Sequence, residues 1–328
     1  MEKTDRIQYI DIAKGIGIIC VIIGHMGWSL VDRIIYPFHM PLFFLLSGCL
    51  ISDKYKFIQY MVLKFKKILF PYFETCIVGC FLAVLANFLL SKIGEERTGL
   101  LRQWIFASMY GSCRDYSEPF IIVGVGPIWF LWALFWALIL VYYVRMKKNG
   151  YVIIIVFASI SFVSSQYIWL PFSIQAGGVA AAFVYIGYCW GRKGILGSWN
   201  KRMVWLGLLV WIIEIVCEVR LDISGNIFDL YGLSAVGAIF ICYFILFLSD
   251  RLIKNKIIVT SLEFLGQNSL LILCLHSLEV KFFPWSLVYS VFGLSGFTAL
   301  VVIFILRIVF CVSCVFVLKR IRKFMGFC

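Results

Sequence analysis

Long apolar segments recur ten times along this chain, separated mostly by short polar connections. They lie near residues 9–30, 34–52, 69–91, 126–144, 151–168, 177–191, 203–219, 231–249, 262–281 and 297–318. A helix needs roughly 20 residues to cross a bilayer, and each segment is about that long. Only 14% of the 328 residues are charged and 62% are hydrophobic. A soluble fold of this length has too little interior for so much apolar surface, so the bilayer is the expected solvent.

The apolar runs also select the type of secondary structure. In lipid, only helices and closed barrels satisfy their own backbone hydrogen bonds. Barrel strands alternate apolar and polar residues over segments of about ten, whereas here the runs are continuous, as at residues 16–23 and 152–158. The sequence therefore predicts an all-α fold, a polytopic transmembrane bundle of about ten helices, forming a single domain over residues 1–328.

The distribution of Lys and Arg predicts the topology. With the N-terminus in the cytoplasm, the inner segments and both termini carry 21 of the 30 basic residues and the outer segments carry seven. This asymmetry follows the positive-inside rule and places both termini in the cytoplasm. The net charge of +13 is explained by anchoring to anionic lipid, so no nucleic-acid partner is expected. We expect a multi-pass membrane protein.

The first apolar segment contains three polar residues that are costly in lipid. Asp11 and Lys14 are three residues apart, so they share a helix face and can pair. His25 follows Lys14 by eleven residues, about three helical turns, which places both on one stripe about 16 Å apart. The alternative is an interfacial ion pair with His25 at the opposite headgroup boundary. Three polar groups on one stripe favour a lined cavity.

Further polar residues flank the second and third segments. His39 opens the second helix and can face His25 across the first loop, which contains Arg33. A basic cluster of Lys64, Lys66 and Lys67 precedes the third segment. Such a cluster either anchors the chain at the inner surface or attracts the phosphates of a polyanion.

Other polar residues lie within the apolar segments themselves. Glu74 is a candidate to line a tunnel. Asn268 and His276 are eight residues apart, on one side of a helix, where hydrogen bonding between helices is the alternative role. Most of the twelve cysteines sit in apolar runs, where Cys acts as a small hydrophobe. The CxxC pair at Cys311 and Cys314 has no second pair or nearby histidine, so no metal is expected.

Several of these motifs together resemble acyltransferase family 3, a family of integral membrane acyltransferases. Lys14 and His25 match the Arg/Lys-x10-His signature of its first helix, although many members carry Arg at the first position. Residues 38–48 resemble its second-helix motif, and residues 64–72, 127–131 and 265–276 are also similar to the family. The resemblance runs through nearly the whole chain. The opening is most similar to the branch that O-acetylates sugars of bacterial surface polysaccharides.

The resemblance implies a function and a set of roles. It implies transfer of an acetyl group from cytoplasmic acetyl-CoA, a co-substrate, to a hydroxyl of an extracytoplasmic glycan: a capsule, an O-antigen or an exopolysaccharide. His25 would be the general base or carry the acyl group briefly. The phosphates would be held by Lys64, Lys66 and Lys67, with Asp11 and Lys14 deeper. An oxyanion would be stabilised by His39, Arg33 or Asn268, and the substrate or tunnel residues are Ser47, Glu74, Asn268 and His276.

Three alternatives stay open at this point. A transporter or flippase for a glycan or small solute would also contain intramembrane charges, although the sequence has no evident inverted repeats. A non-catalytic membrane partner of a glycan-assembly complex would keep the fold without the chemistry. A related enzyme would transfer another acyl group, such as succinyl, or use an amino acceptor. A carboxylate that orients His25 is not identifiable in the sequence, where Asp32 and Glu74 are the candidates.

Overall fold

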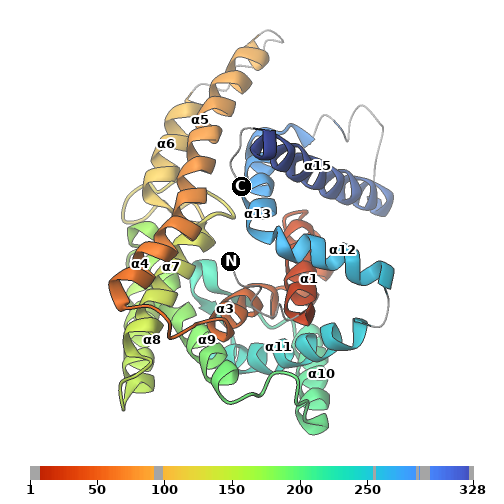
Figure 1. Cartoon of the computed structure of the whole chain (residues 1–328). Coiled ribbons are helices and arrows are strands. Elements are labelled where there is room, and N and C mark those ends of the chain that lie inside the picture. The colour runs from red at the N-terminus through yellow and green to blue at the C-terminus, as the bar shows by residue number, and fades with distance from the viewer. Residues whose placement is uncertain (1–7, 92–98, 254–255, 286–287, 289–295, 325–328) are drawn as a thin grey trace.

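The computed structural model describes residues 8–91, 99–253, 256–285, 288 and 296–324, and they are predominantly helical (Figure 1). The long helices are α1 (Gln8–Gly24), α3 (His39–Cys49), α5 (Phe70–Ser91), α6 (Leu100–Tyr110), α7 (Trp129–Val144), α8 (Gly150–Ser165), α9 (Ile174–Arg192), α10 (Lys201–Val216), α11 (Leu233–Leu252), α12 (Lys256–Gln267), α13 (Ser269–Phe282) and α15 (Gly296–Phe324). Shorter helical pieces are α2 (Ser29–Ile35), α4 (Phe57–Lys64), the π-helix η1 (Phe65–Leu69) and the 3₁₀ turns η2 (Pro171–Ser173), η3 (Ile223–Gly225) and η4 (Leu230–Gly232).

Helices occupy all ten predicted ranges, but they differ in length. Five stretches are long and apolar enough to cross a membrane: Ser29–Cys49, Phe57–Leu89, Pro171–Arg192, Leu233–Leu252 and Gly296–Ile321. The pair α12 and α13, bent by 72°, makes a sixth. The helices α7 and α8 are apolar but shorter. A helical, multi-pass membrane protein is therefore confirmed, whereas ten crossings and cytoplasmic termini stay predictions, and the termini themselves lie outside the described residues.

One element departs from the all-α prediction. Strands β1 (Leu221–Asp222) and β2 (Ile227–Phe228) pair antiparallel across the η3 turn, with Leu221 opposite Phe228. Asn226 has a left-handed backbone with φ of 51°, which asparagine tolerates better than most residues and which turns the chain back. Two residues per strand are too few for an alternating pattern, so the sequence gives little signal for this hairpin.

Glycines let the helices of the bundle pack backbone against backbone. A Cβ at Gly15 of α1 would overlap the backbone of Leu262 in α12, and a Cβ at Gly266 would overlap the carbonyl of Asp11. This close crossing lays α12 along the Lys14 end of α1. The helices α3 and α9 meet in the same way at Gly48 and Gly187. Small residues at such crossings are typical of membrane helix pairs, where dispersion contacts drive association.

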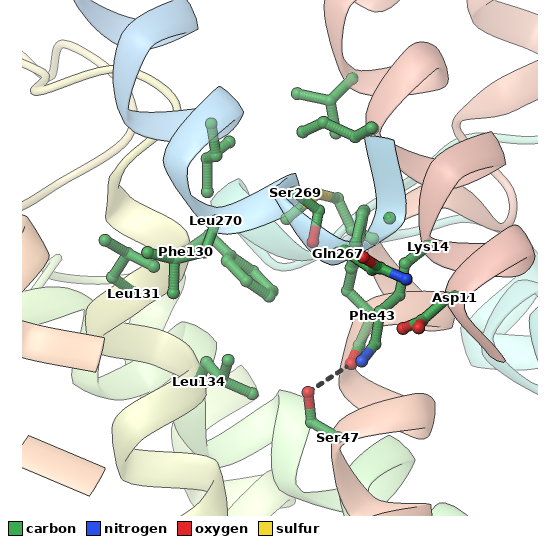
Figure 2. Close-up of a pocket in the computed structure, with 15 residues that line it drawn as sticks. Asp11, Lys14, Phe43, Ser47, Phe130, Leu131, Leu134, Gln267, Ser269 and Leu270 are labelled. Carbon is green, nitrogen blue, oxygen red and sulfur yellow. Dashed lines mark hydrogen bonds between the residues drawn. The ribbon is translucent and has the colours of Figure 1, made fainter. Parts of the chain in front are cut away.

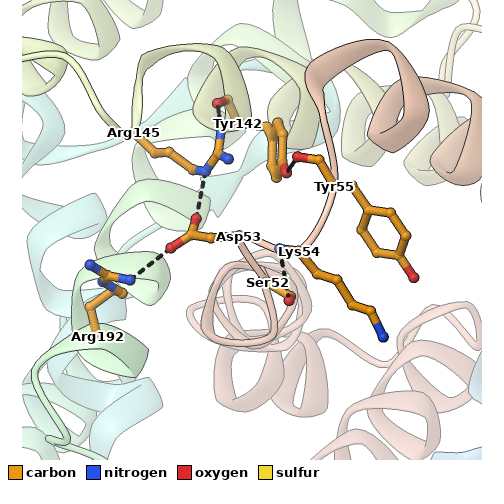
Figure 3. Close-up of polar contacts among 7 residues, drawn as sticks. All are labelled: Ser52, Asp53, Lys54, Tyr55, Tyr142, Arg145 and Arg192. Carbon is orange, nitrogen blue, oxygen red and sulfur yellow. Dashed lines mark hydrogen bonds and ion pairs between the residues drawn. The ribbon is translucent and has the colours of Figure 1, made fainter.

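The loop between α3 and α4 is fastened to the ends of α7 and α9 by a carboxylate (Figure 3). The two oxygens of Asp53 accept hydrogen bonds from Arg145 Nε and Arg192 Nη1, each at 2.7 Å. Arg145 also donates to the carbonyl of Tyr142 and lies 3.3 Å above the centre of the Tyr142 ring. These contacts fix the start of α4 relative to the bundle.

The Tyr142 ring connects the contacts of Asp53 and Arg145 with the basic cluster. It stacks on the ring of Tyr60 in α4, with 3.6 Å between centroids and 7° between planes. The ammonium group of Lys64, one turn further along α4, lies 5.2 Å from the centre of the Tyr60 ring. The position of Lys64 therefore depends on contacts that start at the loop between α3 and α4.

Candidate active site

A cavity of about 270 Å³ lies between α1, α3, α7 and the junction of α12 with α13. We call it the lysine cavity, and Figure 2 shows Asp11 and Lys14 opposite the apolar wall made by Phe130, Leu131 and Leu134. The remaining lining residues are Ile18, Val21, Met40, Phe43, Ser47, Gly266, Gln267, Ser269, Leu270 and Leu273. The cavity therefore combines charged groups at one side with a long apolar surface, which suits an amphipathic ligand.

The bend between α12 and α13 supplies the amide and hydroxyl groups of this cavity. Asn268 stands at the bend, and its side-chain Nδ2 donates to the carbonyl of Phe264 at 2.6 Å. Asparagine competes with helical hydrogen bonds in this way, which favours a break in the helix. As a result Gln267, Ser269 and Leu270 turn towards the cavity, while Asn268 itself is buried beside it.

A second, smaller cavity of about 110 Å³ contains two histidines, and we call it the histidine cavity. His25, directly after α1, and His39, at the start of α3, both line it. His25 is an exposed residue, whereas His39 is 7% exposed. The other lining residues are Val21, Tyr36, Met40, Cys113, Arg114, Pro127, Trp129, Leu221, Asp222, Ile223, Ser224 and Leu273.

Backbone carbonyls determine which nitrogen of each imidazole is available. The Nδ1 atom of His25 lies 2.7 Å from the carbonyl of Val21, and that of His39 lies 3.0 Å from the carbonyl of Ile35. A carbonyl accepts a hydrogen bond but does not donate one, so each Nδ1 carries the proton. In the neutral ring Nε2 then has the free lone pair, which is the arrangement that a general base requires.

A buried cluster lies behind His25. The rings of His25 and His276 meet edge to face, with 5.0 Å between centroids. The Nδ1 atom of His276 lies 2.6 Å from Glu279 Oε1, and Trp285 donates its ring N–H to Glu279 Oε2. Arg307 of α15 approaches the same carboxylate at 3.7 Å and donates to the carbonyl of His25 at 3.4 Å. The cluster therefore holds the end of α1 against α13 and α15.

A third cavity of about 410 Å³ continues from the histidine cavity, and we call it the mouth cavity. The two share four lining residues, Tyr36, Arg114, Leu221 and Asp222. Ion pairs border the mouth cavity: Arg114 with Asp222, and Arg33 with Glu218 at 2.6 Å. Its other lining residues are Ser29, Asp32, Val219, Arg220 and Ile227.

The three cavities form a row, because the lysine and histidine cavities also share lining residues, namely Val21, Met40 and Leu273. Of the residues predicted from sequence, Asp11, Lys14 and Ser47 line the lysine cavity, His25 and His39 the histidine cavity, and Arg33 the mouth cavity. Asn268 and His276 are buried in the adjoining walls. The sequence signature of Lys14 and His25 thus corresponds to two neighbouring cavities along α1.

The basic cluster and Glu74 lie elsewhere. Lys64 is half-buried and within electrostatic range of Lys14 and Lys67. Lys66 and Lys67 are exposed on η1, and Glu74 is exposed on α5. Of the three lysines, Lys64 is therefore the one that the structure brings near Lys14.

Four site residues were not singled out from the sequence. Glu279 follows His276 by three residues, and this spacing on one helix face is a signal that could have identified the pair. Arg307 lies within the apolar segment 297–318, where its charge is the only local signal. Arg114 and Asp222 are 108 residues apart in the chain, so no local pattern joins them.

The fold and the site define the class of this protein: a helical membrane protein with a row of internal cavities, lysine-lined at one end and histidine-lined further along. The family model described as an acyltransferase domain matches residues 7–318. The chain therefore belongs to acyltransferase family 3 and is a membrane acyltransferase. Comparison with curated proteins and with solved structures gives no significant match.

Proposed function

We propose that the protein is an O-acyltransferase that moves an acetyl group from cytoplasmic acetyl-CoA to a hydroxyl of an extracytoplasmic glycan at the bacterial cell surface. The observation that carries this proposal is the adjacency of the lysine and histidine cavities, which share Val21, Met40 and Leu273. The thioester reaches His25 through one cavity while the acceptor reaches it through the other.

The donor end of the row is basic. Lys14 lines the lysine cavity, and Lys64 lies within its electrostatic range. Exposed Lys66 and Lys67 provide further positive charge nearby. Lysine binds phosphate as a flexible point charge. Nucleotide phosphates at this entrance would leave the uncharged pantetheine arm to lie along the apolar wall made by Phe130, Leu131 and Leu134.

The acceptor end supplies the base. The His25 Nε2 lone pair takes the proton of the acceptor hydroxyl, and the hydroxyl oxygen attacks the thioester carbonyl. The carbon–sulfur bond then breaks, the ester forms, and the proton passes to the departing CoA thiolate. His39 also has a free Nε2 lone pair, because its Nδ1 donates to Ile35. We therefore assign His39 to accept a hydrogen bond from the acceptor and orient it.

The charge count along the sequence supports the direction of transfer. It places the Lys14 end of α1 towards the cytoplasm and the His25 end towards the outside. The glycan then enters through the mouth cavity, whose Arg, Asp and Glu side chains suit hydroxyl groups. Labelling with an impermeant thiol reagent checks the orientation by comparing a Lys147→Cys variant with wild type, whose native cysteines include the exposed Cys217. No label beyond that of wild type is expected in intact cells, and additional label there contradicts the orientation.

Transfer of radiolabelled acetyl from acetyl-CoA to the surface glycan of membranes tests the function. Wild type is expected to label the glycan and His25→Ala to lose the label while inserting normally. Full labelling by His25→Ala would refute the role of His25. If wild type transfers no acyl group from any acyl-CoA in the presence of the glycan, the proposal fails and a transporter becomes the better account.

A further inference from the structure

We propose that Val21, Met40 and Leu273, together called the septum, select the acyl group that passes from donor to acceptor. This inference rests on the proposed function and identifies the class of acyl group. The three side chains come from α1, α3 and α13, and they are the lining residues common to the lysine and histidine cavities. A group that moves between the two cavities therefore passes these side chains.

The septum is apolar on every contributing side chain. Val21 is 3% exposed and Leu273 is 6% exposed, while Met40 is half-buried. The polar groups of the row lie on either side of it, with Lys14 and Gln267 in one cavity and the histidines in the other. A charged acyl group would lose its hydration at the septum without gaining a partner there, which is costly. The septum therefore admits uncharged acyl groups and disfavours one with a second carboxylate, such as succinyl.

The space beyond the septum restricts the length of the acyl group. The histidine cavity has a volume of about 110 Å³, less than half that of the lysine cavity at about 270 Å³. The reacting acyl group and the acceptor hydroxyl must share this space next to His25. An acetyl group fits there beside a hydroxyl, whereas each further methylene has to displace the septum side chains. We therefore assign the site to short, uncharged acyl groups, of which acetyl is the smallest.

Two matched substitutions test the assignment. Leu273 and Leu138 of α7 are both buried leucines, but Leu138 lines none of the three cavities. The assay measures kcat/KM for acetyl-, butyryl- and succinyl-CoA in purified wild type, Leu273→Ala and Leu138→Ala. Leu273→Ala is expected to raise the ratio of butyryl to acetyl transfer about tenfold or more, since a few methylene groups in an apolar pocket change selectivity by such factors. Leu138→Ala is expected to keep the wild-type ratio.

Met40→Ala is a second septum variant, for use if Leu273→Ala does not fold or insert. It is expected to raise the ratio of butyryl to acetyl transfer by the same factor. Equal ratios in both septum variants and wild type would overturn the assignment, as would the same rise in Leu138→Ala. Wild type is expected to transfer succinyl at least about tenfold less efficiently than acetyl, and equal transfer would overturn the exclusion of charged groups. If wild type transfers acetyl, a failed septum prediction leaves the proposed function standing. If wild type transfers no acyl group from any acyl-CoA, the proposed function itself has failed.

Discussion

The imidazole rings of His25 and His276 meet edge to face, and His276 is in turn held by Glu279 at 2.6 Å. The carboxylate accepts a hydrogen bond, so it keeps the proton of His276 on Nδ1 and fixes the plane of that ring. His276 then packs against His25 in one orientation. Glu279 therefore acts on the proposed base, His25, through His276. We call Glu279 a positioning residue for this reason.

Glu279→Gln tests this relationship. The amide can keep the shape of the side chain but lacks the charge that holds His276, so turnover is expected to fall about 10- to 100-fold, as for other outer-shell partners. The KM for acetyl-CoA is expected to stay near wild type, because the proposed donor site is at the Lys14 end. Steady-state kinetics on purified protein separates the two quantities. Glu214→Gln is the matched control, since Glu214 is also a buried carboxylate but lies in α10. A similar loss in both variants would assign the effect to general destabilisation.

Lys14→Ala tests the donor end. Lys14 is the lysine that lines the lysine cavity, so loss of its charge is expected to raise the Kd for acetyl-CoA about tenfold or more, the size of one charge-assisted hydrogen bond. Lys14→Arg keeps the charge and is expected to restore most of the affinity. The measurement is acetyl-CoA binding by calorimetry in detergent, with Lys201→Ala, an exposed lysine at the start of α10, as control. Unchanged binding by Lys14→Ala would place the donor elsewhere.

The helical architecture and the row from Lys14 to His25 were predictable from sequence. Hydropathy locates helices because, outside a closed barrel, a backbone in lipid can satisfy its hydrogen bonds only as a helix. Helical periodicity places Lys14 and His25 on one stripe, and both line neighbouring cavities. The prediction of helices is confirmed because it depends only on the local composition of each segment, whereas the roles of Lys14 and His25 stay predictions.

The rest of the site depends on contacts between distant segments. The bend at Asn268 changes the direction of an apolar segment without interrupting its hydropathy. The pairing of Arg114 with Asp222 joins a loop to a two-residue strand. Arg33 contacts Glu218 at the mouth cavity, whereas the sequence suggested a role next to His25. Such pairs depend on the packing of helices, for which a single sequence has no periodic signal.

The two arginines that share Asp53 are expected to differ in their contribution to stability. Arg192 is 59% exposed and, within the described part of the chain, pairs with Asp53 alone, so Arg192→Ala is expected to change the free energy of unfolding by less than about 1 kcal/mol. Arg145 is 12% exposed, stacks on Tyr142 and donates to its carbonyl. Its loss removes a charge-assisted hydrogen bond and a cation–π contact, so Arg145→Ala is expected to cost about 2 kcal/mol or more. Thermal unfolding in detergent compares the two variants, and equal shifts would show that the stacking is not a source of stability.

The crossing of α1 and α12 provides the sharpest test of the fold around the lysine cavity. A Cβ at Gly266 would overlap the backbone carbonyl of Asp11, and a backbone atom cannot move aside as a flexible side chain can. Gly266→Ala is therefore expected to separate the helices and destabilise the protein by about 1–3 kcal/mol, the usual cost of overpacking. Since α12 and α1 both border the lysine cavity, acetyl-CoA binding is expected to weaken as well. Gly225→Ala is the control, because its Cβ would meet only the side chain of Arg114 at 3.4 Å. A Gly266→Ala variant with wild-type stability and binding would mean that the two helices do not cross this closely in the membrane.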